Sequence, residues 1–182
     1  MEQAGEKVWY AMSAVYNHSL YLKEKLEEQQ IECFVPMQYR LVVKGKTKRR
    51  ELVPVIRNLI FIRTTEERIK ELKQQYLFLQ YLIVRTQERA KPIIVPDGQM
   101  RSFIAVAGTH DEYLLYFNPD EINLQAGDRV RITRGIFEGV EGIYMRVKGA
   151  RDRRVVVSIQ GVASIATTSV EPDWIEKIQT DR

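Results

Sequence analysis

The chain has 182 residues, enough for one large domain or two small ones, and 45% of its residues are hydrophobic, as in ordinary globular proteins. No run approaches the ~20 apolar residues that a membrane-spanning helix needs, and residues 1–7 lack the basic and apolar regions of a secretory signal. The single cysteine, Cys33, excludes a disulfide within the chain. These features predict a cytoplasmic protein without a membrane partner.

Charge is distributed unevenly along the chain. Residues 1–107 hold 18 Lys and Arg against 12 Asp and Glu, whereas residues 108–182 hold 10 against 12. A basic N-terminal part indicates contact with nucleic acid or an acidic partner, although a solvated surface explains most imbalances of this size. The acidic balance of the second part weighs against RNA binding there.

The N-terminal part alternates predicted strands and helices. Residues 8–15 and 31–36 have the composition of strands, and Asn17 is placed to cap an amphipathic helix between them. A hairpin follows, with its tip at residues 44–46, and an apolar strand at 54–62 is expected to return to the sheet.

A second helix should start at Thr64, because Thr64 and Glu67 fit a capping box. Residues 77–86 are apolar enough for a buried strand, and a third helix should run from Asp97 to Gly108. The order β-α-β-β-α-β-α is that of a split βαβ fold, an antiparallel sheet with helices on one face. The other face of such a sheet is open to solvent or a partner.

The C-terminal part has a different sequence pattern. Residues 109–122 are polar and irregular, which predicts a linker, and residues 123–178 contain short strands separated by glycine turns. This pattern predicts an SH3-like β-barrel, so the chain as a whole is expected to be α+β with domains at 7–108 and 123–178. The β-branched residues of 155–168 and the interrupting Gly161 favour strands over a helical hairpin.

No set of residues suggests catalysis. His18 and His110 are the only histidines, and neither stands at metal-ligand spacing with Cys, Asp or Glu. Cys33 lies in an apolar strand, where a buried and inert thiol is expected, and no Walker-type phosphate loop is present. The sequence therefore predicts a protein that is not an enzyme and has no metal or cofactor.

Residues 127–142 resemble the KOW motif, in which glycines permit turns and close strand crossings. The residues that carry this resemblance are Gly127, Asp128, Val130, Gly135, Phe137, Gly139 and Gly142. Residues 9–10, 31–36 and 54–62, in this order and followed by a linker and a KOW domain, resemble the NGN domain of NusG-type transcription factors. The resemblance extends from about Lys7 to Ile178.

Within that superfamily the chain is most similar to the specialised paralogues, RfaH and especially the UpxY-type antiterminators of surface-polysaccharide operons. Residues 44–46, Asn58 and residues 137–139 carry this similarity. The family commonly reads P-L-F-P-[GN]-Y, and here Ile56 replaces an aromatic residue, Arg57 a proline and Leu59 a tyrosine.

The resemblance implies that an apolar face of the NGN sheet binds the clamp helices of the largest RNA polymerase subunit. The matching residues are Ile56, Leu59 and Phe61, of which Leu59 and Phe61 share a strand face. Burial in the ordinary core is the alternative for each. The resemblance also places non-template DNA near the first helix, where Tyr16, Asn17, His18 and Lys25 lie.

The hairpin carries a second group of candidate nucleic-acid ligands, which either contact phosphates or only keep the hairpin soluble. These are Lys44, Lys46, Lys48, Arg49 and Arg50.

The resemblance thus implies a monomeric elongation factor that suppresses pausing or termination, with a KOW domain that recruits ribosomal S10 or Rho. The alternatives are a general NusG that engages Rho and a KOW-containing RNA-binding or ribosome-associated protein.

Overall fold

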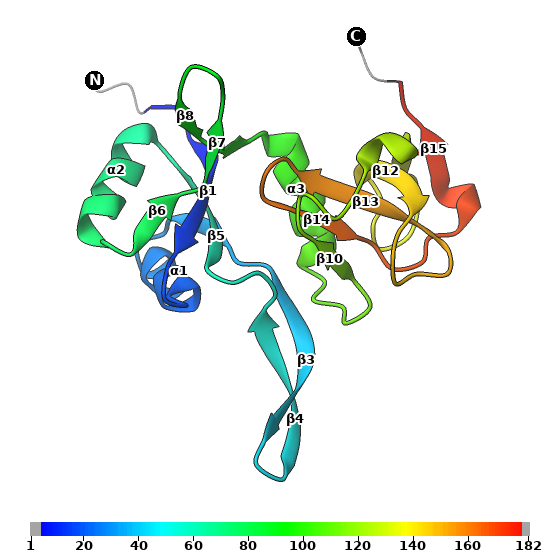
Figure 1. The fold of residues 1–182 in the computed structure, drawn as a ribbon, viewed down its shortest axis with the longest axis horizontal. Helices are drawn as coiled ribbons and strands as arrows, with labels where there is room; N and C mark the ends of the chain where they lie inside the picture. The colour runs from blue at the N-terminus through cyan, green and yellow to red at the C-terminus, as the bar shows by residue number, and fades with distance from the viewer. Residues whose placement is uncertain (1–4, 180–182) are drawn as a thin grey trace. The chain divides into compact units, whose positions relative to one another are not determined.

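The computed structural model describes residues 5–179, which form two compact units (Figure 1). Unit 1 holds the residues up to Pro36 together with Ile56–Asp97, and unit 2 holds Met37–Val55 and the residues from Gly98 onward. Both units contain antiparallel sheet and the chain has three α-helices among its described residues, so the expected α+β class is confirmed. The domain limits 7–108, 109–122 and 123–178 stay a prediction.

Unit 1 is built on a five-stranded antiparallel sheet. Its strands are β1 (Val8–Ala14), β2 (Glu32–Phe34), β5 (Leu59–Thr64), β6 (Leu79–Tyr81) and β9 (Ile94–Val95). The strand order is β2-β5-β1-β6, and β9 also pairs with β1. Nearly every residue of β1 and β5 is buried, which accounts for their continuous apolar sequences, because a strand covered on both faces has no position that favours a polar side chain.

Helices α1 (Ser19–Glu28) and α2 (Glu66–Gln75) cover one face of this sheet, here called the helix face. The Sγ atom of Cys33 lies 4.0 Å from a backbone carbonyl of α1, and the ammonium group of Lys73 in α2 lies 4.1 Å from the centre of the Tyr81 ring. Directly opposed residues of antiparallel strands share a face. The pairing of Ile62 with both Tyr10 and Cys33 therefore assigns these side chains to the helix face.

Both helix starts differ from the sequence prediction. Asn17 lies outside α1 with a φ of 61°, and the cap position is held by His18, whose side chain makes no capping bond. Helix α2 is capped by Thr65, whose hydroxyl accepts a hydrogen bond from the Arg68 amide at 3.2 Å. Thr64 cannot cap α2, because it is the last residue of β5 and is buried in the sheet.

The predicted hairpin tip is confirmed, and the predicted strand does return to the sheet, but it begins later than expected. Strands β3 (Met37–Lys44) and β4 (Thr47–Pro54) pair along their whole length, and Gly45 turns between them with a φ of 63°. The chain then bends at residues 55–58, so β5 is a separate strand that begins at Leu59. Pro54 has no amide hydrogen and Asn58 has a φ of 65°, and both features end the extended ladder.

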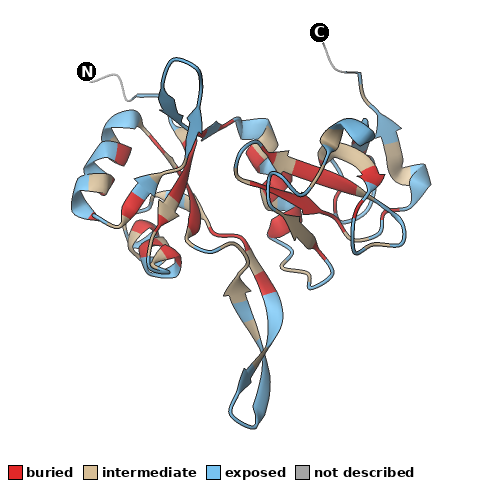
Figure 2. Cartoon of the chain, in the orientation of Figure 1, coloured by how far each residue is buried: buried red, intermediate tan, exposed pale blue. Residues whose placement is uncertain are grey.

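The predicted buried strand at 77–86 is shorter than expected. Only β6 joins the sheet, and its neighbours β7 (Ile83–Arg85) and β8 (Ala90–Pro92) form an exposed hairpin of their own. Figure 2 shows the contrast between the buried strands β1 and β5 and the exposed outer parts of both hairpins.

Unit 2 contains a six-stranded antiparallel sheet in the order β10-β14-β13-β12-β11-β15. The strands are β10 (Leu115–Phe117), β11 (Asp128–Ile132), β12 (Glu141–Arg146), β13 (Arg153–Ile159), β14 (Ala163–Ala166) and β15 (Ile175–Lys177). The short helices η1 (Leu124–Ala126) and η2 (Pro172–Trp174) precede β11 and β15. Residues 123–178 thus form the expected β-structure, and the predicted linker additionally supplies β10.

Helix α3 (Asp97–Ala107) ends where the sequence predicted, before Gly108, and from Gly98 onward it belongs to unit 2. The Ser102 hydroxyl accepts a hydrogen bond from the Glu141 amide at 3.2 Å, which ties α3 to the start of β12. No helix within residues 5–179 is long and apolar enough to cross a membrane.

Candidate functional site

Leu59 and Phe61 lie on the face of the unit 1 sheet that is opposite to the helix face. They are paired with Ser13 and Ala11 of β1. Because side chains alternate along a strand, those of Ile60 and Ile62 lie on the helix face, and those of Leu59 and Phe61 lie on the other. We call this opposite side the distal face. Leu59 is 2% exposed and Phe61 is fully buried, so both are core residues in this structure. A protein partner can contact these side chains only after the distal face has been uncovered.

Ile56 is placed differently. It lies in the bend before β5 and is half-buried, so the alternation of side chains in a strand does not apply to it. Of the three predicted contact residues, the structure brings Leu59 and Phe61 together on one face and leaves Ile56 at the edge.

Arg57 lies at the corner where the bend before β5 meets the loop after β1. Its Nε donates a hydrogen bond to the side-chain oxygen of Asn17 at 3.2 Å, and the Asn17 amide donates to the side-chain oxygen of Asn58 at 2.9 Å. Tyr16, Asn17 and Asn58 all have φ near 60°, a conformation that is uncommon outside glycine. Two of these three residues, Asn17 and Asn58, are joined by a hydrogen bond, and backbone strain of this kind collects at functional sites.

An aromatic cluster adjoins this corner. The His18 ring stacks on Phe78, with ring centroids 4.4 Å apart. The rings of Tyr16 and Tyr21 lie edge-on to His18, with centroid distances of 6.5 and 6.1 Å. The Nδ1 atom of His18 lies 2.8 Å from the Val15 carbonyl, and a carbonyl only accepts, so Nδ1 carries a hydrogen. Tyr16 is 80% exposed, which leaves its ring free to stack on a ligand.

The cluster contains Phe78, which was not among the predicted site residues and which stacks on His18. Leu77, next to it in the chain, is 86% exposed. Neither residue was singled out, because both fall inside the strand expected at residues 77–86, where apolar side chains are ordinary core. Lys25, by contrast, forms an ion pair with Glu28 at 2.9 Å, and this hydrogen bond raises the pKa of Lys25.

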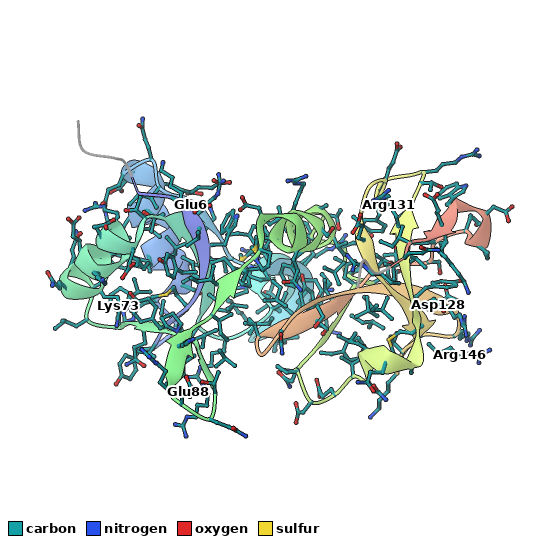
Figure 3. The ribbon with its side chains drawn as sticks, turned by 90° about the horizontal axis from the view of Figure 1, so that it is seen from above. Glu6, Lys73, Glu88, Asp128, Arg131 and Arg146 are labelled. Carbon is teal, nitrogen blue, oxygen red and sulfur yellow. The ribbon has the colours of Figure 1, made fainter. Side chains whose placement is uncertain are left out.

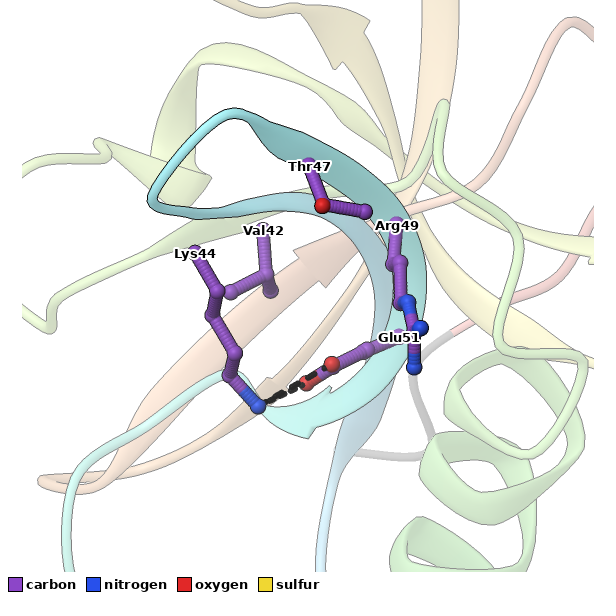
Figure 4. A pocket seen from close by; sticks show the side chains of 5 residues that line it. All are labelled: Val42, Lys44, Thr47, Arg49 and Glu51. Atoms are coloured by element: carbon purple, nitrogen blue, oxygen red, sulfur yellow. Dashed lines mark hydrogen bonds and ion pairs between the residues drawn. The ribbon is translucent and has the colours of Figure 1, made fainter.

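The five predicted hairpin cations are all exposed, but they do not all carry free charge. Lys44 pairs with Glu51 across the hairpin at 3.1 Å, and both side chains line a hollow of about 270 Å³ together with Val42, Thr47 and Arg49 (Figure 4). Arg50 pairs with Glu112 at 3.1 Å and lies over the Tyr39 ring. No ion pair is formed by Lys46, Lys48 or Arg49 within residues 5–179, so these three are the stronger candidates for contacts with phosphate.

The residues that carry the KOW resemblance lie at turns, on strands and in the core of unit 2, and the motif itself stays a prediction. Asp128 opens β11, and Val130 and Phe137 are buried in unit 2. Gly135 has a φ of 83°, which favours glycine. A Cβ atom on Gly142 would clash with the carbonyl oxygen of Val156, so the neighbouring strands β12 and β13 lie too close together there for any other residue. These placements are structural and identify no ligand.

The described residues contain no group of His, Cys, Asp and Glu that could hold a metal ion. Burial raises the pKa of the Cys33 thiol to about 11, so this thiol is neutral at physiological pH and a poor nucleophile.

The candidate residues therefore lie in three places: an apolar sheet face and an aromatic corner with an arginine in unit 1, and a cationic hairpin in unit 2. A family profile described as "Transcription termination factor nusG" matches residues 7–104. The solved structure titled "Domain interaction in Thermotoga maritima NusG" is 20% identical, with 96% of this chain and 98% of that chain covered and a TM-score of 0.45. No curated protein matches the chain. Because the family profile spans more than half of the chain, the protein belongs to the NusG family.

Proposed function

We propose that this protein is a non-enzymatic antitermination factor that binds bacterial RNA polymerase through unit 1. Family membership supports a role in transcription elongation or termination. The observation that carries the finer proposal is the distal face, where Leu59 and Phe61 lie side by side on a strand whose other face is already used by α1 and α2. Once the face is uncovered, burial of each of these two side chains against a partner would contribute roughly 1.5–3 kcal/mol, which offsets the similar cost of exposing it.

The partner of the distal face in this proposal is the pair of clamp helices in the largest polymerase subunit. Ile56, half-buried at the edge, would make the first contact, and Leu59 and Phe61 would follow once the face is uncovered. Binding that holds the polymerase clamp closed would favour the processive state by a shift in populations, without any chemical step. The factor would act as a monomer in the cytoplasm, where transcription takes place in bacteria.

We further propose that the corner and the aromatic cluster contact the non-template DNA strand. Exposed aromatic rings and a cation are the groups with which proteins bind single-stranded nucleic acid. Tyr16 offers a free ring, and Arg57 offers a guanidinium whose one recorded hydrogen bond uses only Nε. The free cations of the hairpin would add contacts to phosphates.

The target in this proposal is a long operon, such as one for a surface polysaccharide, and unit 2 would recruit ribosomal S10 or Rho. A general NusG-type role with Rho is the second candidate. In vitro transcription over a Rho-dependent terminator separates the two. The specialised role predicts increased read-through when the protein is added, whereas increased Rho-dependent termination would reject antitermination.

The contact with the non-template strand is tested by photocrosslinking in a reconstituted elongation complex. The full chain carries a photoreactive residue in place of Tyr16 or, as the control, of Glu71, which is exposed on α2. We expect the non-template strand to be labelled from position 16 and not from position 71. Equal labelling from both positions, or none from position 16, would contradict the proposed DNA contact.

A further inference from the structure

The β3–β4 hairpin has one side of β3 that is apolar and exposed. Because side chains alternate along a strand, those of Tyr39, Leu41 and Val43 leave the same side of β3, and we call these three residues the apolar stripe. Val42 and Lys44 leave the other side. Leu41 is 64% exposed and Val43 is 59% exposed. A single exposed aliphatic residue is ordinary, but a row of them indicates a surface that another molecule covers.

The long cation opposite the apolar stripe does not cover it. Arg50 is paired directly with Leu41, where its aliphatic stem could lie over the leucine. Instead, its guanidinium lies 5.0 Å from the centre of the Tyr39 ring and pairs with Glu112 at 3.1 Å. The aliphatic side chains nearer the tip are therefore left in water, and Figure 2 shows the outer part of this hairpin as exposed.

The outer edge of β3 is open to a further strand. The Tyr39 amide donates a hydrogen bond to the His110 carbonyl at 3.3 Å, so this amide points away from β4. In an antiparallel pair every second residue directs its amide and carbonyl outward, which places those of Leu41 and Val43 on the same edge. Among residues 5–179, β3 pairs with no strand other than β4. A strand added here would continue the edge beyond the one contact that His110 already makes.

The base of the hairpin holds this edge in place. The Gln38 side chain is buried, and its Nε2 donates hydrogen bonds to the carbonyls of Asp111 and Leu114 at 2.9 and 3.0 Å. The ion pair between Arg50 and Glu112 joins β4 to the same segment. A partner would therefore meet an edge that is already ordered, which lowers the entropic cost of binding.

The charge of the hairpin determines which partner fits the edge. Residues 40–51 contain six Lys and Arg residues and one acidic residue, Glu51. Arg40 is exposed on the polar side of β3 and forms no ion pair within the described part of the chain. The hairpin of a second copy would bring like charges together, and cations on edge strands prevent self-association in this way. Nucleic acid would contact the cations, but it neither continues a β-ladder nor covers aliphatic side chains. An acidic polypeptide does all three.

We propose that the outer edge of β3 binds an extended, acidic segment of a partner protein by strand addition. The backbone of this segment pairs with that of Leu41 and Val43. Its side chains alternate, so they are apolar where they lie beside the apolar stripe and acidic where they lie beside Arg40 and Lys44. The inference does not depend on the polymerase proposal, because the hairpin belongs to unit 2 and the distal face belongs to unit 1.

The test measures binding of a fluorescein-labelled peptide of alternating valine and glutamate to the full chain by fluorescence anisotropy. We expect saturable binding, and weaker binding of a matched peptide of alternating valine and lysine. Val43→Thr changes the apolar stripe, and Val42→Thr is the same substitution on the other side of the strand. Loss of one buried methyl group should weaken binding about fourfold in the first variant, whereas the second should bind as the unmodified chain does.

A second pair of variants tests the role of charge. Arg40→Gln removes the cation beside the free edge, and it should weaken binding of the valine–glutamate peptide by about two- to fivefold, the effect of one exposed ion pair. Arg146→Gln removes a cation that extends outward from β12, outside the hairpin (Figure 3), and it should leave the affinity unchanged. Thermal denaturation establishes that all of these variants are folded.

Several results would overturn the inference. These are absence of saturable binding by the valine–glutamate peptide, equal binding of the valine–lysine peptide, and equal affinity of the two valine variants. A dimer of the unmodified chain that Val43→Thr dissociates, measured by sedimentation velocity, would assign the edge to a second copy instead. Tighter binding of an oligothymidine than of the peptide, weakened by Val43→Thr and not by Val42→Thr, would assign the apolar stripe to nucleic acid.

Discussion

Arg57 illustrates how a single residue acquires a role only through its neighbours. The related factors commonly carry proline at this position, and the sequence offered no reason for the change. In the structure the Arg57 side chain is hydrogen-bonded to Asn17, which links the bend before β5 to the loop after β1. Asn58 completes the link through the Asn17 amide and keeps a φ of 65°. Arg57 thus adds a hydrogen bond between these two segments, and a charge beside the aromatic cluster.

Cys33 provides a direct test of burial at the residue scale. Its thiol pKa of about 11 predicts roughly 100-fold less thiolate at pH 8 than an ordinary thiol has, and a correspondingly slower reaction with iodoacetamide. Because burial raises the pKa, the rate for the folded protein should keep rising up to about pH 11, whereas the rate in 8 M urea should level off near pH 9. Equal rates for folded and unfolded protein at pH 8 would contradict the buried assignment.

At the scale of elements, local sequence predicted the strands and helices better than their limits. The tip of the hairpin at Gly45 and the end of α3 before Gly108 were predicted correctly, because a turn glycine and a helix stop have strong local signals. The break between β4 and β5 was missed, because residues 54–62 are apolar throughout and do not reveal which strand pairs with which. Strand β10 was missed for the opposite reason: it has three residues, and only its pairing with β14 defines it.

The close approach of β12 and β13 at Gly142 predicts that no larger residue is tolerated at this position. Gly142→Ala would force its Cβ against the Val156 carbonyl, and overpacking of this kind costs about 1–3 kcal/mol of unfolding free energy. The control is Gly98→Ala in the first turn of α3, where a Cβ meets nothing within 4 Å. That variant should be as stable as the unmodified chain or slightly more so. Urea denaturation measures the unfolding free energy of both variants. Equal stability of the two would contradict the close approach of β12 and β13.

At the scale of the whole molecule, the sequence predicted a two-part chain with docking residues on one strand face, and the shared face of Leu59 and Phe61 followed from alternation alone. Their burial did not follow, because exposure depends on everything that surrounds a strand and not on its own residues. The corner cluster was predicted only in part for the same reason. Tyr16 and His18 are close in sequence, but Phe78 reaches His18 from a segment 60 positions away.

The central claim is that the distal face of β5 binds RNA polymerase, and two substitutions in adjacent residues test it most directly. Leu59→Ala and Ile60→Ala each remove a buried aliphatic side chain from the same strand, on opposite faces, and each should cost about 2–5 kcal/mol of stability. Thermal denaturation establishes that both variants are folded at the temperature of the assay. We predict that Leu59→Ala captures at least tenfold less RNA polymerase than Ile60→Ala, since only the first alters the docking face. Equal capture by the two folded variants would contradict the account.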